Sequence, residues 1–285
     1  MRVSRKLHSD KLVEFLKEDI GFGDITSELL IPEDQWAHGK LYFREAGVVS
    51  GLEETESIFQ LLGCSVTAHT KDGDWVEENQ ILLEVDGSAI SILSGERTAL
   101  NLIGRMAGVA TATAETVKKA SMINPKVKVA ATRKCMPGLR LLDKKAVMHG
   151  GGDPHRYRLD DCILIKDNHL TLVESITNAV DIVRSKVSFT KKIEVEVRTI
   201  DQTVEAAEAG ADIIMFDNMS PAQIRDTMKV MMEKNLREGI LLEASGGITP
   251  DNITDYASTM VDVISLGYLT HSIRSLNVKL EVEMI

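Results

Sequence analysis

Residues 193–224, IEVEVRTIDQTVEAAEAGADIIMFDNMSPAQI, contain a short apolar run and a helical segment, followed by a second pair of the same kind. The runs at 193–197 and 213–216 have the composition of buried strands, whereas 201–209 and 221–232 have helical spacing. The alternation continues on both sides, with strand-like runs at 127–131, 162–165, 240–242 and 263–266 and helical segments at 172–183 and 251–260. This spacing predicts parallel strands with helices outside them, in either a barrel or a doubly wound sheet.

The first part of the chain lacks this rhythm. Helical spacing at 9–20 and 52–62 frames strand-like residues at 36–49, and short strands with Asp-Gly turns follow at 65–87. These features predict a separate α+β domain, followed by a strongly helical segment at 94–109. On spacing alone, Arg97 near the start of that helix is expected to be an ordinary solvated or ion-paired surface residue.

The composition is that of a globular protein in an aqueous compartment. The chain has 285 residues, 44% hydrophobic and 27% charged, with a formal net charge of -10. No apolar run approaches the roughly 20 residues needed to span a bilayer, and the N-terminal sequence lacks the apolar block of a signal peptide, so we expect a cytoplasmic protein with no membrane partner. The three cysteines have no metal-binding or disulfide spacing, and Cys135 is interpreted as a passive residue rather than a reactive thiol.

Positive charge is concentrated in residues 127–170 of this acidic chain. The stretch contains two histidines, His155 and His169, and eight basic residues: Arg133, Lys134, Arg140, Lys144, Lys145, Arg156, Arg158 and Lys166. A basic pocket in an acidic protein can collect a small polyanion without attracting nucleic acid over the whole surface, so no nucleic-acid partner is expected.

Polar residues follow the predicted parallel strands where each strand ends. These strand-end residues are Thr132-Arg133-Lys134, Lys166-Asp167-Asn168-His169, Glu196, Asp217-Asn218, Glu243 to Gly247, and Gly267. The carboxyl ends of such strands meet at one mouth in a parallel barrel, which is where catalytic groups lie in that architecture.

The strand-end residues fall into three chemical groups. Arginine and lysine side chains with His155 suit an anion, since arginine can bind a carboxylate bidentately. Glu196 and Asp217 could hold magnesium or ribose hydroxyls. The backbone N–H groups near Ser245 and Gly246, together with Gly267, could bind a phosphate. A substrate that needs all three groups is a phosphorylated sugar with a diphosphate, joined to an acidic acceptor.

The motifs at these positions resemble those of the quinolinate phosphoribosyltransferase family, the carboxylating nicotinate-nucleotide pyrophosphorylases. They cover nearly the whole chain in order: EDIGFGDIT, KDGDWVEENQILLEVDG, SGERTALN, TRK, PGLRLLDKKAV, GGG with HR, LIKDNH, IEVEV, MFDNM, EASGGI and ISLGYLTHS. The resemblance implies an N-terminal α/β sandwich domain over 1–110 and an incomplete α/β barrel over 111–271, with a tail at 272–285 that returns to the first domain. It also implies a homodimer with shared active sites, which in some cases assembles further into a hexamer.

The resemblance implies a role for each matching residue. Arg97 would reach the partner's active site and contact quinolinate, which replaces the surface interpretation. Quinolinate would also be bound by Arg133, His155, Arg156 and Lys166. Phosphoribosyl pyrophosphate and its Mg²⁺ would be served by Lys134, Glu196 and Asp217, with the two carboxylates contacting the metal directly or indirectly, and its 5-phosphate by Ser245, Gly246, Gly267 and His271. The expected products are nicotinate mononucleotide, pyrophosphate and CO2, in NAD biosynthesis.

The chain differs from the family pattern at Ala131, Pro154 and Arg158, and Arg158 would add a cation inside or beside the acceptor pocket. Ala131 and Pro154 are similar to residues of a paralogue associated with molybdate transport. Two alternatives therefore stay open: a related phosphoribosyl or ribosyl transferase with another anionic acceptor, and a non-catalytic homologue that binds phosphoribosyl ligands.

Overall fold

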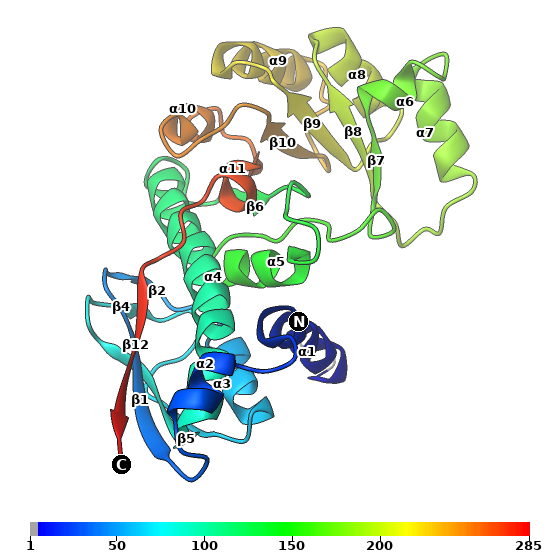
Figure 1. Ribbon diagram of the computed structural model, residues 1–285. Coiled ribbons are helices and arrows are strands. Elements are labelled where there is room, and N and C mark those ends of the chain that lie inside the picture. The colour runs from blue at the N-terminus through cyan, green and yellow to red at the C-terminus, as the bar shows by residue number, and fades with distance from the viewer. Residues whose placement is uncertain (1–4) are drawn as a thin grey trace. The chain divides into compact units, whose positions relative to one another are not determined.

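The computed structural model describes residues 5–285, which form two compact units of different architecture (Figure 1). The first unit comprises residues up to Ala112, His149–Gly151 and Ile273–Ile285, and the second comprises Thr113–Met148 and Gly152–Ser272. Among the described residues, no helix is both long enough and apolar enough to cross a membrane.

The first unit is built on an antiparallel sheet of four strands in the order β12-β1-β5-β3. Its elements are α1 (Arg5–Ile20), α2 (Ile25–Leu30), β1 (Trp36–Phe43), β2 (Gly47–Val48), α3 (Leu52–Leu61), β3 (Ser65–Ala68), β4 (Trp75–Val76), β5 (Ile81–Ser88), the first part of α4 (Ala89–Ile123) and β12 (Val278–Met284). Alternate residues of β1 are buried, including Leu41 and Phe43, so one face of the sheet packs on the core.

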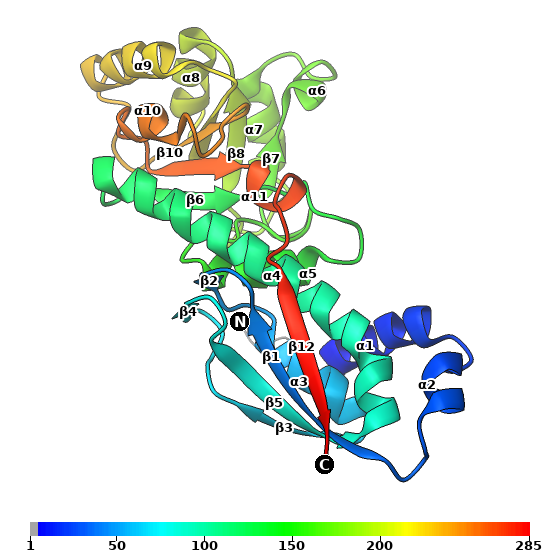
Figure 2. The ribbon, with the colours of Figure 1, turned by 60° about the vertical axis from the view of Figure 1, so that its left-hand side comes forward.

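The C-terminal tail of the chain completes this sheet. Strand β12 pairs with β1 from Ala37 opposite Met284 to Phe43 opposite Val278, and Figure 2 shows the two strands side by side. Before it reaches the sheet, the tail passes closely over α4. A Cβ atom at Gly108 would lie 2.2 Å from the carbonyl oxygen of Arg274, so only glycine allows the backbone to pass there.

The second unit contains a parallel sheet of six strands in the order β6-β11-β10-β9-β8-β7. Its elements are β6 (Lys128–Ala131), α5 (Arg140–His149), β7 (Ile163–Ile165), α6 (Asp167–Leu170), α7 (Ile176–Arg184), β8 (Ile193–Val197), α8 (Ile200–Glu208), β9 (Ile213–Asp217), α9 (Pro221–Glu233), β10 (Leu241–Ser245), α10 (Ile253–Ala257), β11 (Val263–Leu266) and α11 (Tyr268–His271). The second unit also includes the end of α4, and its sheet contains five residues of β8 that are all buried.

The strand order distinguishes a barrel from a doubly wound sheet. Strands β7, β8, β9, β10 and β11 lie side by side in chain order, and the first strand of the sheet in sequence, β6, pairs with the last one, β11. A barrel has this order, because its first strand pairs with its last. Within the described chain, β6 and β7 do not pair with each other, so the barrel is incomplete. The expected fold class is therefore confirmed.

Local sequence explains where several helices of this unit begin. Ser220 caps α9 with Gln223 in a capping box, and Pro221 occupies the first turn. Thr199 caps α8 in a similar way through the backbone N–H of Gln202. The expected helix at 94–109 was too short, because α4 runs from Ala89 to Ile123 without a break.

Candidate active site

A pocket of about 410 Å³ opens at the carboxyl ends of the parallel strands. Its lining residues come entirely from the second unit: Thr132, Arg133, Lys134, His155, Arg156, Leu164, Lys166, Glu196, Met215, Asp217, Asn218, Glu243, Ser245, Gly246, Gly247 and Ser265. The structure thus brings together most of the side chains that the sequence selected. The exceptions are Gly267 and His271, which are not lining residues, and Arg97, an exposed residue of the first unit.

Two arginines, Arg133 and Arg156, line the pocket, and Arg140 lies near enough for its charge to act on Arg133. The Nε atoms of Arg133 and Arg140 are buried and have no hydrogen-bond partner among the described residues. Burial lowers the pKa of Arg133, and the positive charges of Arg156 and Arg140 lower it further. Cations held this close together favour an anionic ligand.

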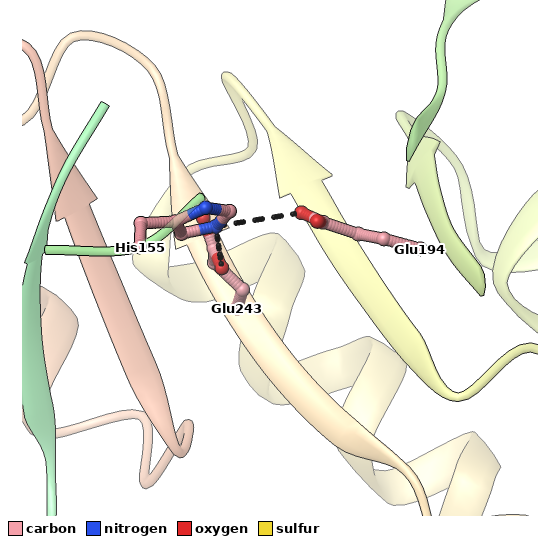
Figure 3. A group of neighbouring side chains, drawn as sticks. All are labelled: His155, Glu194 and Glu243. Atoms are coloured by element: carbon pink, nitrogen blue, oxygen red, sulfur yellow. Dashed lines mark hydrogen bonds and ion pairs between the residues drawn. The ribbon is translucent and has the colours of Figure 1, made fainter. Parts of the chain in front are cut away.

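One histidine and two buried glutamates form a group at the pocket, in which His155 and Glu243 are lining residues and Glu194 is not. Figure 3 shows the imidazole of His155 facing both carboxylates, with Nε2 3.1 Å from Oε2 of Glu243 and 3.9 Å from Oε1 of Glu194. The other ring nitrogen, Nδ1, accepts a hydrogen bond of 2.7 Å from the backbone N–H of Arg156. Both ring nitrogens therefore have partners within the chain, and the Nε2 proton faces Glu243.

The two glutamates influence each other and the histidine. Burial, and then the charge of Glu243, raises the pKa of Glu194 to about 7. Burial disfavours the imidazolium form of His155, but the hydrogen bond to Glu243 and the charges of Glu243 and Glu194 outweigh it, so the pKa of His155 is raised. The ligand atoms of the three residues lie within 4.8 Å of one another, a donor set that could hold a metal ion.

The two carboxylates that the sequence suggested for magnesium are paired with basic side chains. Glu196 lies 2.5 Å from the Nζ of Lys166. Asp217 accepts hydrogen bonds from Nε and Nη2 of Arg198 at 2.9 and 2.8 Å, and its other oxygen accepts from the amide of Asn218 at 2.8 Å. Arg198 also reaches Asp167 at 2.9 Å, so it links two strand ends.

Two consecutive glycines form a corner at the end of β10. Gly246 and Gly247 have φ angles of +92° and +63°, which are costly for side-chain-bearing residues. A Cβ atom at Gly246 would lie 2.5 Å from the side-chain oxygen of Asn218. Successive N–H groups in such a turn can face one anion, and the hydroxyl of Ser245 lies beside them.

Gly267 and His271 lie at the border of this corner. A Cβ atom at Gly267 would be 2.7 Å from Nε2 of His271 and 3.0 Å from Cδ of Lys134, so the three residues are immediate neighbours. The hydroxyl of Thr270 also donates to the carbonyl of Lys134 at 2.8 Å. Although neither Gly267 nor His271 lines the pocket, both adjoin a lysine that does.

Sequence reasoning missed Glu194, Arg198 and the burial of Lys144. Glu194 could have been found from IEVEV, because residues two apart in a strand share a face and Glu194 therefore faces the same way as Glu196. Arg158 is exposed and is not a lining residue, so its predicted position inside the acceptor pocket is not seen, and a position beside the pocket stays a prediction. Burial raises the pKa of the Cys135 thiol, as expected for a passive cysteine.

Comparison with known proteins identifies the family. The model of the C-terminal domain of quinolinate phosphoribosyl transferase matches residues 109–281, and that of the N-terminal domain matches 24–107. The chain belongs to the quinolinate phosphoribosyl transferase family. Every residue that lines the pocket lies within the match to the family's C-terminal domain, whereas Arg97 lies within the match to its N-terminal domain.

Individual members of the quinolinate phosphoribosyl transferase family are similar over almost the entire chain. A probable carboxylating nicotinate-nucleotide pyrophosphorylase of Methanothermobacter thermautotrophicus is 46% identical, over 96% of this chain and 98% of its own. The human carboxylating nicotinate-nucleotide pyrophosphorylase is 37% identical over 85% of this chain and 81% of its own. The crystal structure of NadC from Streptococcus pyogenes has a TM-score of 0.93, with 34% identity, 100% of this chain covered and 99% of the other.

Proposed function

We propose that this chain is a carboxylating nicotinate-nucleotide pyrophosphorylase, a phosphoribosyltransferase of NAD biosynthesis. It joins quinolinate to phosphoribosyl pyrophosphate and releases nicotinate mononucleotide, pyrophosphate and CO2. The observation that carries the proposal is Arg133, which lines the pocket at the strand ends beside Arg156 and whose buried Nε has no hydrogen-bond partner among the described residues. A dicarboxylate supplies negative charge to both of these arginines.

The acceptor binds on the arginine side of the pocket. Arg133 and Arg156 each bind a carboxylate of quinolinate, for which the planar guanidinium offers two parallel donors. His155 borders the same space, with its Nε2 proton directed to Glu243 and its Nδ1 to the backbone of Arg156. Lys166 joins the acceptor by exchanging part of its contact with Glu196 for a substrate carboxylate.

The donor binds on the glycine side. The N–H groups of Gly246 and Gly247 and the hydroxyl of Ser245 hold the 5-phosphate, with Gly267 and His271 at its border. Lys134, which adjoins Gly267, neutralises the diphosphate that leaves. This arrangement places both substrates in one pocket, with the ribose carbon C1 between the arginine side and the glycine side.

The residues present suit Mg²⁺ that arrives with the substrate. Carboxylate oxygens are the ligands magnesium prefers, and it is commonly bound by one or two carboxylates together with substrate phosphates. Glu196 and Asp217 would hold it, although their pairing with Lys166 and Arg198 favours contact through water. When bound, the ion would neutralise negative charge on the diphosphate.

The proposed reaction requires positioning and charge, and no covalent nucleophile. The ring nitrogen of quinolinate bonds to C1 as the bond from C1 to the diphosphate oxygen breaks, and positive charge develops at C1. Glu196 and Asp217 stabilise that positive charge, while Lys134 neutralises negative charge on the leaving diphosphate. The bond from C2 to its carboxylate then breaks to release CO2, the positive ring nitrogen stabilises the electron pair left on C2, and C2 takes up a proton from solvent.

We also propose a cytoplasmic homodimer in which Arg97 completes the site of the partner subunit. The support is the exposed position of Arg97 on α4, where its guanidinium is accessible to a second subunit. Arg97→Ala and Lys134→Ala proteins are each expected to be inactive alone. Mixed and allowed to exchange subunits, they are expected to recover up to about a quarter of the activity, because one of the two sites in a mixed dimer is intact. No recovery after verified exchange would contradict the sharing of sites.

The decisive assay combines the protein with Mg²⁺, phosphoribosyl pyrophosphate and quinolinate. Formation of nicotinate mononucleotide and CO2 in equal amounts is the expected result. Binding of both substrates without turnover would indicate a non-catalytic homologue. Binding of phosphoribosyl pyrophosphate without binding of quinolinate would indicate a transferase with another acceptor.

A further inference from the structure

A lysine is buried completely beneath the anion-binding side of the pocket. Lys144 lies on α5, is 0% exposed, and is among the largest fully buried side chains of the described residues. It does not line the pocket. A buried ammonium group is costly unless it is hydrogen-bonded, so its partners indicate why it is there.

Both hydrogen-bond acceptors of the Lys144 ammonium are backbone carbonyls. Its Nζ donates to the carbonyl of Ala131 at 2.9 Å and to the carbonyl of Pro154. Ala131 ends β6 and directly precedes Thr132-Arg133-Lys134, whereas Pro154 directly precedes His155-Arg156. One side chain therefore binds the last residue before each of the two segments that carry the acceptor site.

The Lys144 side chain takes the place of a backbone hydrogen bond at the end of the short parallel bridge between Ala130 and Asp153. The N–H of Asp153 donates to the carbonyl of Val129, and the N–H of Ala131 donates to the carbonyl of Asp153. The next bond of a parallel ladder would run from the N–H of His155 to the carbonyl of Ala131. That N–H instead donates to the Asp153 side chain at 2.8 Å, since His155 has a φ of +52° and turns away. The Ala131 carbonyl accepts from Lys144 in its place.

The charges around Lys144 do not account for its presence. Burial lowers the pKa of Lys144 to about 8, against the attraction of Cys135 and Asp153 and together with the repulsion of Arg140 and Arg133. An apolar side chain of similar length would fill the same volume without desolvating a charge. It would leave the two carbonyls without their donor, which is costly for buried backbone groups.

We propose that Lys144 is a positioning residue for the acceptor site, which holds the Thr132–Lys134 and His155–Arg156 segments at a fixed separation through the two carbonyls that precede them. The inference rests on the proposed function, because it assigns quinolinate to these segments. Arg133 and Arg156 can grip the two carboxylates of one rigid ring only if their backbones are held at one spacing. The glycine corner at 245–247 follows from the end of β10, and neither of the carbonyls that Lys144 binds belongs to it.

The test compares Lys144→Met, which keeps the length of the side chain, with Lys229→Met, a matched change at an exposed lysine of the same unit. Calorimetric titration with quinolinate and, separately, with ribose 5-phosphate gives the two affinities. For Lys144→Met we expect quinolinate affinity to fall at least tenfold and ribose 5-phosphate affinity to change less than threefold. For Lys229→Met both stay within twofold. Equal losses of the two affinities, or no loss of either, would overturn the proposal.

Amide hydrogen exchange separates this proposal from the proposed function. In ligand-free Lys144→Met, peptides covering 130–136 and 153–158 are expected to exchange at least tenfold faster than in the unaltered protein, with 213–217 unchanged. If the unaltered protein does not bind quinolinate, the acceptor assignment fails, and exchange alone decides whether Lys144 fixes the two segments. Lys144→Gln, with a shorter side chain that keeps an amide donor, is expected to show smaller effects. If neither variant folds, Lys144 is required for folding itself and the positioning role is refuted.

Discussion

Arg133→Met gives the sharpest test of the anion site, because the same change should weaken binding and leave the fold intact. The buried Nε of Arg133 has no hydrogen-bond partner in the described part of the chain, and the charges of Arg156 and Arg140 oppose its own. Methionine fills much of the same volume and removes the charge. In the absence of ligand we therefore expect a melting temperature equal to or above that of the unaltered protein.

The loss of affinity can be worked out from the bonds involved. A bidentate arginine–carboxylate pair makes two charge-assisted hydrogen bonds, worth about 1.5 kcal/mol each at the lower end of their range. Removal of the Arg133 charge relieves repulsion with the neighbouring arginines in the free and the bound protein alike, so this relief cancels in the affinity. The loss of about 3 kcal/mol corresponds to an affinity for quinolinate that is weaker by a factor on the order of 100.

The assay is calorimetric titration of quinolinate into the folded variant, with thermal unfolding measured on the same sample. Arg158→Met is the matched control, since Arg158 is exposed and does not line the pocket, and its affinity should stay within twofold. A folded Arg133→Met protein that binds quinolinate within threefold of the unaltered protein would refute the assignment of Arg133. Equal weakening of quinolinate and phosphoribosyl pyrophosphate would refute the division of the pocket into an acceptor side and a donor side.

Three further predictions concern the buried groups and the backbone. The pKa of Glu194 in the folded protein is about 7, above its ordinary value, so between about pH 4.5 and 7 the folded state keeps a proton that the unfolded state releases, and stability falls as pH rises through this range. Glu194→Gln should therefore raise the melting temperature at pH 8 and leave it unchanged at pH 4.5. The opposite pattern would contradict the buried carboxyl pair. Burial raises the pKa of the Cys64 and Cys135 thiols and raises that of Cys162 to about 11. A thiol reagent at pH 8 should therefore modify all three cysteines at least tenfold more slowly in the folded protein than in denaturant. Fast modification of any one of them in the folded state would show an activated thiol. Gly108→Ala places a Cβ atom against the backbone of Arg274 and should lower the free energy of unfolding by about 3 kcal/mol. The control is Gly95→Ala in the same helix, whose Cβ atom meets only the flexible end of Leu62 and should lower that free energy by about 1 kcal/mol. Equal costs in urea unfolding would mean that the tail can shift away from α4.

Much of the second unit could be predicted because its signals are local. Short apolar runs separated by helical segments follow directly from the two periodicities, and caps such as Ser220 fix where the helices begin. Parallel strands bring their carboxyl ends to one edge, so residues such as Arg133, Glu196 and Asp217 could be grouped before any coordinates were known. The first unit was harder, since its sheet pairs β1 with β12 from the opposite end of the chain. The length of α4 was also missed, because its helical pattern continues beyond the stripe at 94–109.

By itself, the sequence determined the alternation of strands and helices, the polar strand ends, and the motifs that place the chain in its family. These are properties of neighbouring residues, which the periodicity of the backbone orders without reference to the rest of the fold. Only the tertiary structure decided the charge state and the pairing of the site. Glu194 has a raised pKa because it is buried and because Glu243 approaches it from another strand. Asp217 is bound by Arg198, and Lys144 is buried against the carbonyls of Ala131 and Pro154. Burial and the approach of groups distant in sequence set these energies, and neither quantity is defined until the chain has folded.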